Sequence, residues 1–149
     1  MRTAYGDERL PIHLYLPKNV DPPYQTVVYF PGSNAIFADS LSRVPAEFVV
    51  KDGRAVILPV FKGTYERRDD LDTDMPNETV AYRDRVIQWY RDLGRSIDYL
   101  ETREDIDPGR LAFMGVSWGA AMGPILMAIE PRFEAGVVVV AGLNFQKAL

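Results

Sequence analysis

A serine stands between two glycines in residues 115–119, which read Gly-Val-Ser-Trp-Gly. This spacing is typical of a sharp turn between a strand and a helix, because small residues two positions before and after the serine avoid a clash. The pattern therefore predicts that Ser117 is a nucleophile and that Gly115 and Gly119 form its turn. A helix N-terminus at this point favours developing negative charge. The backbone N–H of Trp118 is then expected to point to where an oxyanion would form.

A serine hydroxyl is a weak nucleophile that needs a base, and histidine is the usual one. The chain contains one histidine, His13, more than a hundred residues before Ser117. It lies in an alternating apolar segment, so we expect a half-buried structural histidine rather than a catalytic one. Only two carboxylates, Glu130 and Glu134, follow the serine. At 1.5 Å per helical residue Glu130 would lie about 18 Å away, too far to reach Ser117.

Apolar segments and turn signals place this motif in an α/β fold. Strands are predicted over residues 11–17, 26–30, 54–60, 111–116 and 135–143, with a break at 106–110. Helices are predicted over 44–51, from Glu78 to Leu100 with Asn77 as its N-cap, and over 118–129, where Pro124 favours a kink. Strands separated by helices of this length indicate a mostly parallel sheet of about five strands with helices on both faces, a three-layer αβα sandwich.

At this point the sequence resembles the α/β-hydrolase superfamily, and within it the esterase branch of dienelactone-hydrolase-like and prolyl-oligopeptidase-like domains. "YFPGSN" after a buried strand is similar to the family's oxyanion loop, with Pro31 in the place of its usual histidine. "GVSWG" matches the nucleophile elbow, and "DIDPGRLAFMGVSWGAAMG" matches the approach to it. The resemblance implies a serine acyl hydrolase without cofactor or metal, acting on a small ester or peptide. It also implies that the N–H of Ser33 is the second oxyanion donor beside that of Trp118.

The family's acid and histidine follow the serine, on strands that have no counterpart in this sequence. We therefore expect residues 1–149 to be a single, incomplete α/β-hydrolase domain with about five of the usual eight strands. Such a chain would be inactive or weakly active alone. The alternative is a non-catalytic fragment that serves in binding or oligomerisation. Strand 135–143 would lie at an open sheet edge, which predicts self-association or pairing with a complementing segment.

Two further segments carry polar residues at suggestive positions. Tyr65, Glu66 and Arg67 follow the strand at 54–60, and ligands of open α/β sheets bind at the carboxyl ends of strands. They are predicted either to line the substrate side or to form a structural loop. Asp70, Asp72 and Asp74 alternate as in a calcium loop, but Met75 and Ala81 occupy the positions that require glycine and glutamate, so a solvated loop is expected.

The composition limits the partners. The net charge of −4 and a pI near 5.0 argue against nucleic acid, which requires a basic face. The absence of cysteine excludes disulfides and thiolate chemistry. The N-terminus lacks the apolar run that a signal peptide requires, and no stretch reaches the roughly 20 apolar residues that cross a bilayer. We therefore predict a cytoplasmic protein with no membrane partner.

Overall fold

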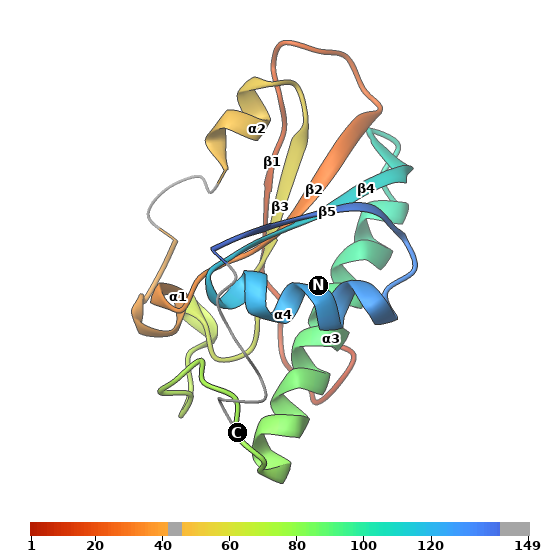
Figure 1. Cartoon of the computed structure of the whole chain (residues 1–149). Helices are drawn as coiled ribbons and strands as arrows, with labels where there is room; N and C mark the ends of the chain where they lie inside the picture. The colour runs from red at the N-terminus through yellow and green to blue at the C-terminus, as the bar shows by residue number, and fades with distance from the viewer. Residues whose placement is uncertain (42–45, 141–149) are drawn as a thin grey trace.

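The computed structural model describes residues 1–41 and 46–140 and contains one five-stranded sheet (Figure 1). The strands are β1 (Ile12–Tyr15), β2 (Tyr24–Phe30), β3 (Ala55–Pro59), β4 (Ile106–Val116) and β5 (Phe133–Val139), in the spatial order β1-β3-β2-β4-β5. β1 is antiparallel to β3, and the other four strands are parallel. The predicted mostly parallel sheet is confirmed. Because four carboxyl ends meet at one edge, the loops after β2, β3 and β4 lie at that edge.

Helices cover both faces of the sheet. They are α1 (Asn34–Phe37), α2 (Glu47–Lys51), α3 (Val80–Glu101) and α4 (Trp118–Ile129), with a 3-10 turn η1 (Tyr65–Arg67). α3 and α4 share one buried cluster with the sheet face that carries Val28, Phe30 and Phe113. The short helix α2 packs on the opposite face, against Val27 and Val56. This arrangement confirms the three-layer αβα sandwich.

The main core lies between the sheet and the pair α3 and α4. The predicted apolar stripe of α3 supplies it, with Trp89, Leu93, Ile97 and Leu100 fully buried. Packed aromatic rings extend this core towards the carboxyl edge of the sheet, where the rings of Phe30 and Phe61 stack with centroids 4.1 Å apart. Packed aromatic pairs contribute beyond their buried area. The edge that carries Ser117 is therefore supported from below by a rigid core.

Two local predictions were wrong. Residues 106–110 were expected as a break, but β4 starts at Ile106. Ile106 pairs with Tyr24 and Leu111 pairs with Thr26, so four residues on β4 are set against one on β2. Pro108 lacks an N–H group for the sheet ladder, which explains why the chain bulges there and then resumes.

The start of α3 is the second difference. Thr79, not Asn77, is the N-cap, and its hydroxyl accepts a hydrogen bond from the N–H of Tyr82 at 3.1 Å. Asn77 lies in the loop before the helix, where its side-chain oxygen accepts a hydrogen bond from the N–H of Thr79. Both residues are good cap formers, so the choice depends on where the loop meets the helix.

Three other elements have the type that the sequence predicted. The predicted helix over 118–129 is confirmed as α4, which continues through Pro124. The strand over 135–143 is confirmed as β5 from Phe133 to Val139, and its last predicted residues lie outside the described residues. The helix over 44–51 is observed as α2 from Glu47, with its predicted start also outside them. Among residues 1–41 and 46–140, the helices are too short or too polar to span a bilayer.

Candidate active site

Ser117 occupies a strained backbone position between β4 and α4. Its φ of 54° and ψ of −111° lie in a region that residues other than glycine rarely adopt, and its side chain is exposed. Two backbone hydrogen bonds hold Ser117 in this conformation. The N–H of Ser117 donates to the carbonyl of Val139 on β5 at 2.9 Å, and its carbonyl accepts from the N–H of Ala121 at 3.0 Å. Strain of this kind is maintained only where the surroundings fix it, and it gathers at functional sites.

The two flanking glycines are required by close backbone contacts. A methyl group at Gly115 would overlap the carbonyl of Gly119 and lie 2.8 Å from the nitrogen of Ala120. A methyl group at Gly119 would lie 2.8 Å from the carbonyl carbon of Phe30 and 2.9 Å from the oxygen of Pro31. No side-chain movement can relieve contacts with backbone atoms. The spacing in the sequence therefore reflects two places where the main chain is crowded.

The loop after β2 lies directly beside the serine. The N–H of Gly119 donates to the carbonyl of Pro31 at 3.0 Å, which joins this loop to the elbow. A methyl group at Gly32 would lie 3.4 Å from the Cβ of Ser117. Ser33 follows and begins α1. The structure thus brings together the two segments in which the sequence placed the oxyanion donors.

The two predicted oxyanion donors are the backbone N–H groups of Ser33 and Trp118. Among residues 1–41 and 46–140, the N–H groups of Ser33 and Trp118 donate no hydrogen bond to a protein acceptor. The N–H of Trp118 also belongs to the first turn of α4, where the helix dipole adds positive potential. Two N–H donors beside an exposed hydroxyl are suited to an oxygen that gains negative charge.

The side chain of Trp118 is part of the core. It is 2% exposed, and its ring meets those of Phe30 and Trp89 edge-on at centroid distances of 5.0 and 4.9 Å. With so little of its surface exposed, the ring packs as a core residue. The indole N–H has no partner within the described part of the chain.

The single histidine does not reach Ser117. His13 lies on β1, and two strands, β3 and β2, separate it from β4. Three inter-strand steps of about 4.8 Å each give about 14 Å across the sheet. The Nε2 atom of His13 lies instead 3.5 Å from a carboxylate oxygen of Glu66. The geometry agrees with a half-buried structural histidine.

The carboxylate of Glu130 is bound by Arg132. It is buried at the end of α4 and receives three hydrogen bonds from Arg132, two from the guanidinium and one from the backbone N–H. These bonds lower the pKa of Glu130. Glu134 lies exposed on β5. The structure therefore assigns neither glutamate to the serine.

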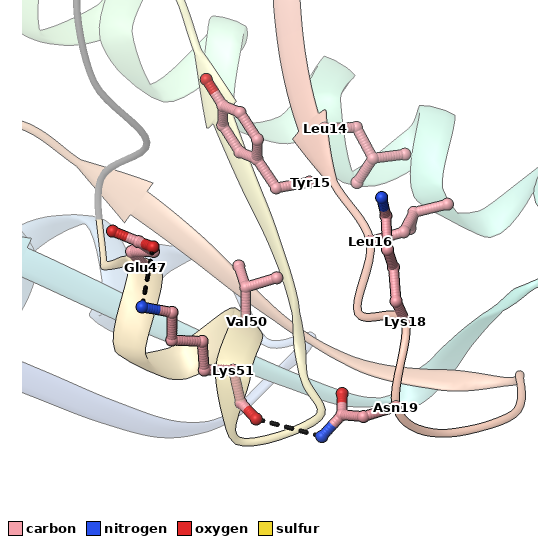
Figure 2. A pocket seen from close by; sticks show the side chains of 8 residues that line it. All are labelled: Leu14, Tyr15, Leu16, Lys18, Asn19, Glu47, Val50 and Lys51. Atoms are coloured by element: carbon pink, nitrogen blue, oxygen red, sulfur yellow. Dashed lines mark hydrogen bonds and ion pairs between the residues drawn. The ribbon is translucent and has the colours of Figure 1, made fainter.

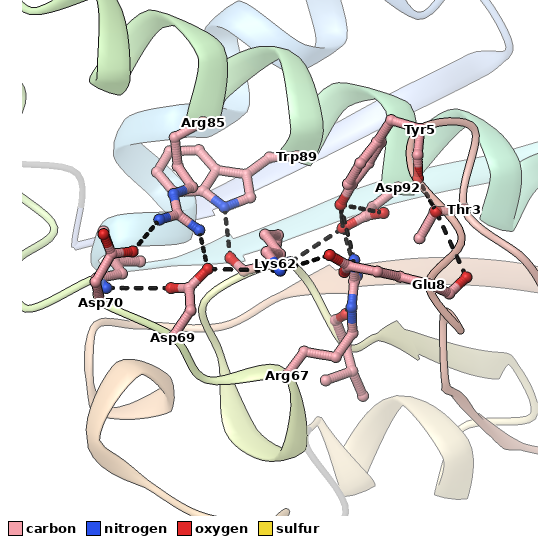
Figure 3. A network of polar contacts seen from close by, with 12 residues as sticks. Thr3, Tyr5, Glu8, Lys62, Arg67, Asp69, Asp70, Arg85, Trp89 and Asp92 are labelled. Carbon is pink, nitrogen blue, oxygen red and sulfur yellow. Dashed lines mark hydrogen bonds and ion pairs between the residues drawn. The ribbon is translucent and has the colours of Figure 1, made fainter.

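The segment at Tyr65, Glu66 and Arg67 lies at the same sheet edge as Ser117 but mostly faces inward. Tyr65 is buried, with burial raising its pKa to about 12. Arg67 is also buried and forms an ion pair with Asp92 of α3 at 2.6 Å (Figure 3). Only Glu66 has an exposed side chain. The assignment of this segment to the substrate side stays a prediction, and inward contacts account for two of its three side chains.

The network around Arg67 was not expected from the sequence. Its guanidinium donates to the carbonyl of Val60 at 2.7 Å and to the hydroxyl of Tyr5 at 2.7 Å. Tyr5 in turn donates to Asp92 at 2.9 Å (Figure 3). Burial raises the pKa of Asp92, whereas the Arg67 guanidinium and the Tyr5 hydroxyl lower it. No short motif links residues so far apart in the chain, so only the fold reveals this cluster.

Two hollows lie away from the serine. One of about 590 Å³ lies between β1 and α2, with Leu14, Tyr15 and Val50 as apolar lining and Lys18 at its rim (Figure 2). Because β1 is antiparallel, its carboxyl end lies at the sheet edge opposite Ser117. The second, of about 480 Å³, lies on the α2 face beside β4 and β5, and its lining is mostly apolar. Neither contains a residue of the elbow or of the loop after β2.

Neither a protein-family profile nor a curated protein matches this sequence. Solved structures are similar in fold. A post-proline cleaving enzyme from Rickettsia typhi matches 93% of this chain with a TM-score of 0.64 and 20% identity. A candidate dienelactone hydrolase from Klebsiella pneumoniae matches 88% with a TM-score of 0.60 and 21% identity. Est1E from Butyrivibrio proteoclasticus, solved with ferulic acid bound, matches 89% with a TM-score of 0.63 and 16% identity.

These similarities confirm the α/β-hydrolase fold that the sequence suggested. At such identities they establish the fold alone. The chain spans 20% of the Rickettsia enzyme, 54% of the Klebsiella protein and 49% of Est1E. The described part of the fold is therefore a portion of what those proteins contain.

Proposed function

We propose that this chain is the core of a serine acyl hydrolase in which Ser117 attacks the carbonyl of a small ester or a peptide. The observation that carries the proposal is the strained, exposed Ser117 beside two backbone N–H groups that have no protein acceptor in the part of the chain that the structure describes. The structural neighbours include, by name, a post-proline cleaving enzyme and a candidate dienelactone hydrolase, which supports the same class. The chemistry of the site, rather than the fold, decides the assignment.

In the proposed reaction the Ser117 oxygen forms a bond to the carbonyl carbon, and the carbonyl oxygen becomes an oxyanion. The N–H groups of Trp118 and Ser33 donate to that oxyanion. Losing one such donor typically lowers the rate about 100- to 1000-fold. The Ser117 proton goes to a base that neither His13 nor Glu130 supplies. We infer that the base and its acid come from outside residues 1–41 and 46–140.

This inference predicts weak or no turnover by the chain alone. Without the histidine, a serine site retains only the roughly 1000- to 10,000-fold acceleration over water that its oxyanion donors and binding give. The alternative function, a non-catalytic binding or oligomerisation module with the same fold, is favoured by the distance between Ser117 and His13. The two functions make different predictions for one experiment.

The experiment measures hydrolysis of a short p-nitrophenyl ester by the wild type, Ser117→Ala and Ser40→Ala. The hydrolase proposal predicts acylation of Ser117 by the ester, with weak turnover at most, and Ser117→Ala should abolish both. Ser40→Ala is the matched control, because Ser40 is exposed and lies outside both the elbow and the loop after β2, so this variant should behave as the wild type. Equal inertness of all three chains, together with no acylation of Ser117 by mass spectrometry, would support the non-catalytic module instead.

We also propose that the β5 side of the sheet is an interaction surface for a second copy or a complementing strand. β5 forms one end of the described sheet, and Val137, Val138 and Val139 are 53%, 42% and 36% exposed. An edge strand with exposed valines invites pairing with another strand. Sedimentation should show self-association that Val138→Lys weakens, since charged lysine protects sheet edges. A wild-type monomer that binds no hydrophobic dye would contradict this.

A further inference from the structure

We propose that the turn formed by residues 65–68 is a positioning device for the oxyanion loop. It fixes α1 and, through α1, the backbone N–H of Ser33 relative to Ser117. The inference rests on the proposed function for its catalytic meaning. Its structural part is independent of that function.

The helix α1 needs outside support. It has four residues, and its N-cap, Ser33, makes no side-chain capping bond. So short a helix is not stable by itself in water, so tertiary contacts must hold it. The hydrogen bonds from Ala35 to the Gly32 carbonyl and from Ile36 to the Ser33 carbonyl, each 3.0 Å, close its first turn. The position of the Ser33 N–H therefore follows the position of α1.

The 65–68 turn holds α1 at both ends. Near the start of α1, the buried ring of Tyr65 belongs to the same apolar cluster as Ala35. At its end, the guanidinium of Arg68 donates to the carbonyl of Phe37 at 3.4 Å and to Asp39 at 2.5 Å. A contact at each end restrains both the translation and the rotation of a single helical turn.

The turn is itself strained and braced. Tyr65 has a φ of 46°, a left-handed conformation that is unfavourable for a side chain of this size. The N–H of Gly63 donates to the Arg67 carbonyl at 3.0 Å, and the N–H of Arg67 donates to the Thr64 carbonyl at 2.8 Å. The strained conformation directs the Tyr65 ring inward, where it meets α1. Strain held by such a brace is an observation from which a positioning role can be inferred.

The brace is attached to α3 by buried charges. Asp92, fully buried on α3, accepts from the Arg67 guanidinium at 2.6 Å and from the N–H of Lys62 at 3.0 Å (Figure 3). Trp89, one turn earlier on α3, donates its indole N–H to the Lys62 carbonyl at 2.9 Å. The long helix α3 thus fixes the segment after β3. That segment carries the turn that supports α1.

Nitrogen-15 NMR of the whole chain tests the proposal. Arg68→Ala and Tyr65→Ala should shift the Ser33 amide resonance and raise the exchange rates of the Ala35 and Ile36 amide protons at least tenfold. Glu66→Gln is the matched control, because Glu66 lies in the same turn but its side chain faces His13. Resonances of α4 should stay in place in all variants.

The outcomes are distinct. An unchanged Ser33 resonance in folded Arg68→Ala would overturn the proposal, as would equal changes throughout α4 and the sheet. Should Tyr65→Ala fail to fold, Arg68→Ala decides, because the Arg68 side chain is half exposed and its removal leaves the core intact. This readout needs no turnover. Failure of Ser117 in the ester assay is therefore separate from failure of the positioning role.

Discussion

Two alanine substitutions of helical glycines should change stability in opposite directions. Gly119→Ala places a methyl group 2.8 Å from the Phe30 carbonyl carbon and 2.9 Å from the Pro31 oxygen, closer than the 3.0 Å below which Cβ contacts are essentially never found. Gly94→Ala, in the middle of α3, places its methyl group 3.8 Å from Arg132 and 3.9 Å from Glu130, which is ordinary contact. The same chemical change is made in two helices, and only the space around it differs.

The magnitudes follow from propensity and packing. Alanine is favoured over glycine by about 1 kcal/mol inside a helix, so Gly94→Ala should stabilise the fold by about 0.5 to 1 kcal/mol. Gly119→Ala forces the loop after β2 away from the elbow, and overpacking of this kind costs about 1 to 3 kcal/mol or more. It also strains the hydrogen bond from Gly119 to Pro31. We expect a net destabilisation of about 2 kcal/mol or more.

Urea denaturation measures both variants against the wild type, provided that the denaturant slope is unchanged. Two results would contradict these expectations: a Gly119→Ala stability within about 0.5 kcal/mol of the wild type, or a Gly94→Ala variant as destabilised as Gly119→Ala is expected to be. The first result would mean that the elbow and the loop after β2 are not in contact. The second would mean that the environment of α3 near its middle is more crowded than described.

Three further outcomes are expected. Arg67→Met leaves the Asp92 carboxylate buried without its cation, so urea denaturation should show a loss of about 3 to 5 kcal/mol in the free energy of unfolding. The double variant Arg67→Met, Asp92→Leu should recover much of that loss. Equal losses in the single and the double variant would argue against the ion pair. Hydrogen bonds from Arg132 lower the pKa of Glu130, so stability should fall as the pH drops below the ordinary value of 4.5, and Glu130→Gln should show a shallower loss in acid titrations. Burial raises the pKa of Tyr65 to about 12, so the free energy of unfolding should fall as the pH rises from 10 towards 12, where the unfolded chain loses the Tyr65 proton first. In Tyr65→Phe this fall should be shallower, and a fall as steep as that of the wild type would contradict the expectation.

The sheet and the elbow could be predicted because their signals are local. Continuous apolar runs such as residues 26–30 leave few alternatives to a buried parallel strand. The Gly-x-Ser-x-Gly spacing is a five-residue motif that can be read directly, although the crowding at Gly119 comes from the loop after β2. Both kinds of pattern can be read from neighbours in the chain, and both agree with the structure.

Other features depend on contacts that the sequence does not display. The choice of Thr79 over Asn77 as cap depends on how a loop meets a helix. The inward direction of Arg67 depends on Asp92, 25 positions later, and on the hydroxyl of Tyr5. Position at a carboxyl edge left open whether the segment with Arg67 would line the substrate side or form a structural loop. The buried partner on α3 explains why the Arg67 side chain faces inward, and this partner is seen only once the helix is packed.

The network at Asp92 also bears on the order in which the chain can fold during synthesis. Tyr5 meets a residue 87 positions later. At roughly 5 to 20 residues per second, a ribosome takes about 4 to 17 seconds to add that length. Throughout that interval the hydroxyl of Tyr5 has no Asp92 to bind. The contact between Tyr5 and α3 can therefore form only late in synthesis, whereas Glu8 of the same segment can already pair with Lys62.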